Sequence, residues 1–257
     1  MQRGDVTVLS ISAALAAVVA VAVAFSVHVL DADRSSALVS RDSDSSWLVL
    51  TWSPSFCRAQ PTNAACASGD LAGMGRTLIL HGLWPQPREN QYCGVSRRVQ
   101  EESSRGHRDL PPVELSAGVR DGLAATMADA PNLSLHEWYA HGTCSGLTPE
   151  AFFGQALTLA TQVREAFDPL FTDDQGRQLT LSALRSRADE RFGSGAGERV
   201  GMSCLNAAGE GPYVVDVRLS LPAVAAMRTV DGDLDLRRLL TQAPPLTSQC
   251  GHGLIPG

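Results

Sequence analysis

The chain has 257 residues, 44% of them hydrophobic, and a formal net charge of −6. This length and composition predict one well-packed domain and exclude a chain that is disordered throughout. The negative charge excludes the global basic field that drives nonspecific duplex binding, and the absence of lysine excludes lysine-based catalysis and P-loop phosphate binding.

The N-terminal segment is almost uninterruptedly apolar from Val6 to Leu30, with Arg3 ahead of it and Asp31 behind it. It is long enough to span a bilayer as a helix, and Ala22-Val23-Ala24 also fits a cleavage site. We therefore expect residues 1–30 to be a signal peptide or an N-terminal signal anchor. Either one exports the remainder, which is then secreted, periplasmic or membrane-anchored.

Residues 31–46 are rich in Asp, Ser and Arg and are expected to form a linker, so that the folded domain covers residues 47–257. An even number of cysteines in an exported domain points to disulfides, and no C-x-x-C pair favours a metal. Only eight residues separate the first two cysteines, which favours a local bridge. The six cysteines are Cys57, Cys66, Cys93, Cys144, Cys204 and Cys250.

The first half of the domain begins with two short buried strands, at Trp47–Trp52 and Thr77–Leu80. The second strand is expected to deliver His81 at its end. Gln86–Pro112 is polar with Pro and Gly, which predicts a long loop. Val113–Ala130 has helical periodicity, and Pro131-Asn132 should then break the chain.

The second half begins with Thr148-Pro149-Glu150, which is typical of a helix N-terminus and predicts a helix to about Phe167. Ser182–Phe192 predicts another helix, Tyr213–Leu221 a strand, and Leu234-Asp235-Leu236 a short strand or turn. Helices and strands mixed without strict alternation predict an α+β fold, with an antiparallel sheet as its core, several packed helices and disulfides within a single domain.

Residues 135–144 hold two histidines, a glutamate, two aromatic residues and a cysteine. Histidine beside a carboxylate suggests acid/base chemistry. As an alternative, Ser134 and Glu137 form a capping-box pattern for a helix that ends at Gly142. His136 and His141 are five residues apart, whereas the zinc-protease pattern needs four, so metal binding is disfavoured.

A second stretch, His81-Gly82-Leu83-Trp84-Pro85, precedes His136-Glu137-Trp138-Tyr139-Ala140-His141-Gly142-Thr143-Cys144. Together they resemble the two active-site motifs of the ribonuclease T2 family, whose members are secreted or lysosomal-type endoribonucleases. Leu50–Cys57 also resembles the family's first strand, and the likeness covers about residues 47–250.

The resemblance implies cleavage of single-stranded RNA by transphosphorylation, through a 2′,3′-cyclic phosphate to 3′-phosphate ends, with low base specificity. It implies no metal, no other cofactor and a monomer that contacts a membrane only through an uncleaved N-terminal segment. His141 resembles the general base, His81 the general acid and His136 the phosphate-binding histidine, and Glu137 assists at the phosphorane.

The resemblance also places Trp84 and Tyr92 at positions of a base-stacking platform, with Gln86 at a position that influences base preference. It selects the disulfides Cys57–Cys66, Cys93–Cys144 and Cys204–Cys250.

The chain departs from the family pattern at Ala140, where a lysine is usual. Arg58 and Arg88 are candidates to supply the missing cation. Two other interpretations remain open. One is a catalytically weakened or inactive RNA-binding relative, which the loss of this lysine allows and the retention of His81, His136, Glu137 and His141 opposes. The other is a secreted metallohydrolase, which the histidine spacing disfavours.

Overall fold

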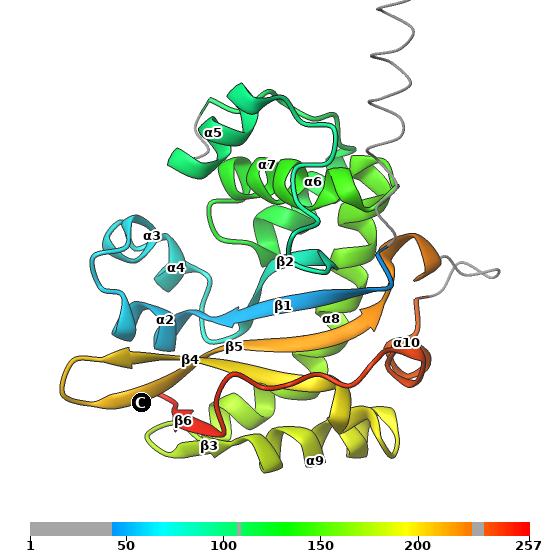
Figure 1. Cartoon of the computed structure of the whole chain (residues 1–257). Helices are drawn as coiled ribbons and strands as arrows, with labels where there is room; N and C mark the ends of the chain where they lie inside the picture. The colour runs from blue at the N-terminus through cyan, green and yellow to red at the C-terminus, as the bar shows by residue number, and fades with distance from the viewer. Residues whose placement is uncertain (1–42, 107–108, 228–233) are drawn as a thin grey trace, which may run out of the picture. The chain divides into compact units, whose positions relative to one another are not determined.

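The computed structural model describes residues 43–106, 109–227 and 234–257, which fold as helices packed on one sheet (Figure 1). The strand order is β2-β1-β5-β6-β3, with β4 paired to β5. Every pairing is antiparallel except that of β5 with β6, which is parallel. The fold is therefore α+β as predicted, with one parallel contact that the sequence did not indicate. The strands are β1 (Ser45–Trp52), β2 (Leu78–Gln86), β3 (Gln178–Thr180), β4 (Val200–Ala207), β5 (Gly211–Pro222) and β6 (His252–Leu254).

The helices of the described residues fall into three groups by their place in the chain: after β1, after β2, and interleaved with β3 to β6. The first group is α2 (Ser53–Ala59), α3 (Ala64–Ala67) and α4 (Asp70–Gly73). The second is α5 (Arg97–Arg105), α6 (Ala117–Thr126), α7 (Ala130–Ala140) and the 3-10 turn η1 (Gly142–Cys144). The third is α8 (Pro149–Asp173), α9 (Leu181–Phe192), η2 (Ala196–Arg199), η3 (Val224–Met227) and α10 (Leu236–Gln242).

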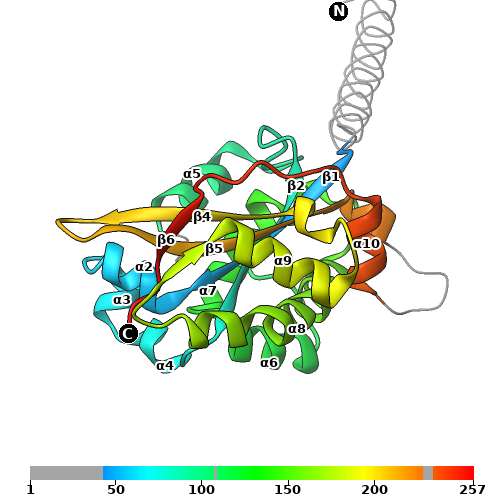
Figure 2. The ribbon, with the colours of Figure 1, turned by 90° about the horizontal axis from the view of Figure 1, so that it is seen from below.

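One face of the sheet builds the main core against α8 and α9, which lie on the same side of it in Figure 2. Leu48 and Leu50 of β1 point to this face and are fully buried. The other face carries residues of odd number in β1, because side chains alternate along a strand. Helix α8 begins at its predicted cap, Thr148, but continues past Phe167 because the apolar face extends to the buried Phe171.

The predicted loop of residues 86–112 is wrong in part, because it contains α5. Val99 is the one apolar residue of this helix, so hydrophobic periodicity did not reveal it. Ion pairs of Glu101 with Arg97 and Arg105, one turn apart on each side, support it instead.

The predicted break at Pro131-Asn132 and the capping box are also wrong. Helix α7 starts at Ala130, with Pro131 in its first turn and Asp129 as N-cap. Ser134 and Glu137 are therefore interior helix residues, and Glu137 is only 1% exposed. The predicted strand or turn at residues 234–236 is instead the start of α10, whose N-terminus is capped by Asp235.

The proposed signal segment of residues 1–30 and most of the linker lie outside the described residues, and β1 already includes Ser45 and Ser46. Across residues 43–106, 109–227 and 234–257, none of the helices combines the length and hydropathy needed to cross a membrane.

Candidate active site

His81 projects from a β-bulge in β2. Opposite β1, Val49 pairs with Gly82 and Leu50 pairs with Leu80, so His81 is the extra residue between the two pairs. The extra residue shifts the alternation of the residues that follow it, so that Trp84, three positions after His81, pairs with Trp47 and lies on the same face of the sheet as His81. His81 therefore lies within β2, on the face that carries Thr51, and not at the strand end that the sequence predicted.

Gly82 follows the bulge and leaves room for two side chains of the site. A Cβ atom at this position would collide with the carboxylate of Glu137 and with the indole nitrogen of Trp84. The glycine is thus required by close approach, because the carboxylate fills the space that a side chain would take.

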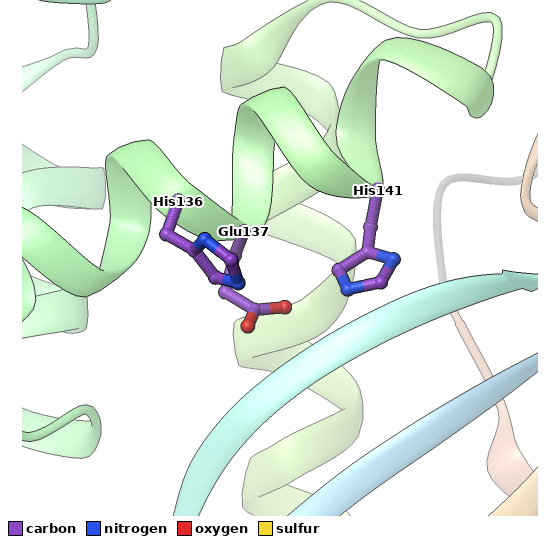
Figure 3. Close-up of side chains that lie close together, drawn as sticks. All are labelled: His136, Glu137 and His141. Atoms are coloured by element: carbon purple, nitrogen blue, oxygen red, sulfur yellow. The ribbon is translucent and has the colours of Figure 1, made fainter. Parts of the chain in front are cut away.

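The end of α7 gathers His136, Glu137 and His141, whose side chains converge in Figure 3. One ligand atom from each lies within 4.8 Å of the other two. On a regular helix, positions five apart would be about 140° apart around the axis. His141 escapes this rule because it follows the last helical residue, with φ −124° and ψ −47°. The spacing argument against a shared ligand position was therefore wrong.

Trp84 contacts Glu137 and two of the histidines. Its indole N–H donates to Glu137 Oε2 at 2.8 Å, and its ring centroid lies 5.3 Å from that of His141 and 5.1 Å from that of His81. Burial raises the pKa of Glu137 to about 8, and the hydrogen bond from Trp84 opposes this only in part. Glu137 is therefore a neutral carboxylic acid at mildly acidic pH.

His141 is 8% exposed, and its Nδ1 has no hydrogen-bond partner within the described part of the chain. Burial, followed by repulsion from His136 and His81, lowers its pKa to about 3. The imidazole is thus neutral over most of the pH range, which is the form that can accept a proton.

His136 is held by α5, the helix that the sequence did not reveal. Its Nδ1 lies 2.8 Å from Ser103 Oγ and 3.2 Å from the Ser103 carbonyl oxygen. Ser103 also accepts a hydrogen bond from the Tyr92 hydroxyl at 3.3 Å. Since a carbonyl only accepts, Nδ1 carries the proton in that contact, and the contact with Ser103 fixes the orientation of the ring.

A cleft of about 440 Å³ lies over the sheet face and contains His81, His136 and His141. Trp84 and Gln86 line it as well, and the Gln86 side chain donates to the Trp84 carbonyl at 3.2 Å. Tyr92 lies beside the cleft, next to Ser103. The structure therefore brings the four predicted catalytic residues together and keeps the three predicted base-binding residues nearby.

Two arginines line the cleft, Arg88 and Arg218. Arg58 does not: it is bound to Glu210, with its Nε 2.8 Å from Oε2, so this candidate for the missing cation is wrong. Arg218, which the sequence did not single out, lies over the Trp47 ring at 5.5 Å and donates to Gln249 at 3.0 Å. Its position in a strand gave no signal of its role.

Three disulfides join the cysteines as the resemblance implies: Cys57 with Cys66, Cys93 with Cys144, and Cys204 with Cys250. The second links the segment that follows β2 to the turn after His141. It therefore fastens the two motif-bearing segments to each other.

A family model described as the Ribonuclease T2 family matches residues 43–222, which include every histidine of the site. The chain belongs to the ribonuclease T2 family. Membership supports the coarse activity, an endoribonuclease with an RNA substrate.

Curated relatives of this T2 family member agree with the assignment. Ribonuclease MC of Momordica charantia is 29% identical over 167 residues, which cover 61% of this chain and 78% of the relative. Ribonuclease I of Escherichia coli is 24% identical over 239 residues, covering 83% and 86%. Among solved structures, bitter gourd RNase MC1 superposes with a TM-score of 0.53 at 23% identity, covering 82% of this chain and 99% of that one. This structural likeness shows the fold alone.

Proposed function

We propose that this T2 family member is a metal-independent endoribonuclease that cleaves single-stranded RNA by transphosphorylation. The observation that carries the proposal is the convergence of His81, His136 and His141 in one cleft, with the buried carboxyl group of Glu137 close to His136 and His141. The 2′-hydroxyl attacks the adjacent phosphate, so the reaction needs a base, an acid and a group that holds the phosphate.

The electrostatics of the site support distinct roles for the histidines. His141 is neutral above about pH 3 and acts as the base toward the 2′-hydroxyl. His81 acts as the acid toward the 5′-oxygen leaving group, and His136 binds the phosphate. Glu137, protonated below about pH 8, donates a hydrogen bond to the crowded phosphorane instead of adding a negative charge. The products are a 2′,3′-cyclic phosphate and then a 3′-phosphate.

Base recognition is proposed to be weak and to involve Trp84, Gln86 and Tyr92. The Trp84 ring is already stacked on His141 at 30°, so its first role is to order the histidines. Stacking on a remaining aromatic face tolerates any base, which agrees with low specificity. We also propose that the domain acts outside the cytoplasm, as a monomer, after export through its N-terminal segment.

The first experiment digests RNA in excess EDTA with the wild type, His81→Ala and His141→Ala. We expect the wild type to remain active and both variants to lose at least about a hundredfold in kcat. A metallohydrolase using the donor cluster of His136, Glu137 and His141 would stop in EDTA. An inactive RNA-binding relative would show no cleavage in any sample.

The second prediction concerns position 140, where this chain has alanine and the family usually has lysine. A cation at position 140 would stabilise the charged phosphate, and Ala140 lines the cleft. We expect Ala140→Lys to raise kcat about tenfold, whereas Ala140→Met, which adds similar length without charge, should not. Equal rates for Ala140→Lys and the wild type would mean that Arg88 or Arg218 already supplies the charge.

A further inference from the structure

Thr51 connects His81 to an acid outside the histidine cluster. It lies in β1, directly opposite Asp216 of β5, and its side chain shares the cleft with both. Thr51 Oγ1 is 2.7 Å from Asp216 Oδ1 and 3.4 Å from His81 Nδ1. The three side chains thus form a row across three neighbouring strands.

The donors and acceptors in these three side chains fix the direction of the two hydrogen bonds. A carboxylate only accepts, so the Thr51 hydroxyl donates its hydrogen to Asp216. The hydroxyl oxygen then accepts from His81, which places a proton on Nδ1 and leaves Nε2 for the leaving oxygen of the substrate. A long apo hydrogen bond of this kind is expected to shorten when the imidazole is charged.

We propose that Asp216 is a positioning residue for His81 and acts through the hydroxyl of Thr51. The inference rests on the proposed function, in which His81 is the general acid. Asp216 fixes the tautomer of the acid and stabilises its protonated form, although it does not touch the substrate.

The charges around His81 agree with this role. Burial lowers the pKa of His81, and the charge of Asp216 opposes that shift. Glu137 is protonated below about pH 8 and contributes little charge at acidic pH. The other titratable or charged residues that line the two cavities next to His81 are Arg88, Arg105, Asp129, His136, His141 and Arg218. Two acids line these cavities, Asp129 and Asp216. Asp216 is the one that a hydrogen-bonded side chain, that of Thr51, links to His81.

The first test follows the His81 imidazole by nitrogen-15 NMR in the wild type and in Asp216→Asn. We expect its pKa to fall by about one unit or more when the charge is removed. The alkaline limb of kcat/KM against pH should move down by the same amount, because the acid must be protonated to act. Asp121→Asn, an exposed substitution on α6, is the matched control and should change neither quantity. An unchanged His81 pKa in Asp216→Asn would overturn the proposal.

The second test keeps the acid and alters the link. Thr51→Val removes the hydroxyl at nearly constant shape, whereas Thr51→Ser retains it. We expect Thr51→Val to mix the two His81 tautomers and to lower kcat about tenfold to a hundredfold, while Thr51→Ser stays close to the wild type. Equal kcat values and tautomers for the two variants would contradict the inference.

Different results would overturn the proposed function and the positioning role of Asp216. An active His81→Ala enzyme would defeat the proposed function itself. An inactive His81→Ala enzyme, together with wild-type behaviour of Asp216→Asn and Thr51→Val, would defeat the positioning role alone.

Discussion

Glu137 is the residue whose environment differs most from what the sequence indicated. The sequence offered it as a capping residue at a helix start, which would be exposed, or as a partner of a catalytic histidine. In the structure it is buried under β2, accepts a hydrogen bond from Trp84 and lies close to His136 and His141. Its identity as a site residue was predictable from the motif, but its protonation depends on burial, which local sequence does not encode.

Burial of Glu137 predicts a pH-dependent stability. The unfolded carboxyl loses its proton above about pH 4.5 and the folded one above about pH 8, so the folded protein holds more protons between these values. The free energy of unfolding should therefore fall as pH rises through that window. His141 acts in the opposite sense between about pH 3 and its ordinary value of 6.5, so the fall is cleanest above pH 6.5.

Urea unfolding at pH 6.5 and pH 8 tests this prediction in the wild type and in Glu137→Gln. We expect the wild type to lose roughly 2 kcal/mol between the two pH values, and the glutamine variant, which cannot ionise, to lose much less. Equal losses in both proteins would mean that Glu137 is ionised in the folded state.

At the scale of elements, the bulge in β2 and the early end of α7 create the site. The bulge puts His81 and Trp84 on one face of β2, and the end of α7 at Ala140 brings His141 close to His136 and Glu137. The regular parts, such as β1, β5, α8 and α9, were predictable from hydrophobic patterning. The bulge was not, because it depends on how two strands pair, and α5 was not, because it is a polar segment that is held by contacts with α7, including that of the buried Ser103 with His136.

Gly82→Ala tests the packing of β2 against α7. The added methyl group would collide with the Glu137 carboxylate and the Trp84 indole, so we expect a loss of about 1–3 kcal/mol in stability. RNA cleavage by the folded fraction should also fall, because the carboxylate must move. Gly73→Ala, at a site with open space around it, is the matched control. Wild-type activity in Gly82→Ala would show that Glu137 need not occupy this position.

At the scale of the whole molecule, the disulfides and the charge distribution fit an exported RNA-cleaving domain. Cys93–Cys144 closes a sequence separation of 51 residues, and the chain-entropy model assigns such a loop about 4 kcal/mol. The cleft lies on a chain with net charge −6, so substrate attraction must come from local arginines and the histidines. Fold class and family were predictable from the sequence, whereas the links from α5 to His136 and from β5 to His81 were not, because they join distant segments.

We propose that the three histidines cleave RNA by transphosphorylation without a metal. Mass spectrometry of the fragment ends, after brief digestion of a defined single-stranded RNA in excess EDTA, tests it most directly. We expect 2′,3′-cyclic phosphate ends that convert slowly to 3′-phosphates, and no cleavage of a substrate with 2′-deoxy sugars at every position. Fragments with 5′-phosphate ends, or activity that EDTA abolishes, would contradict it.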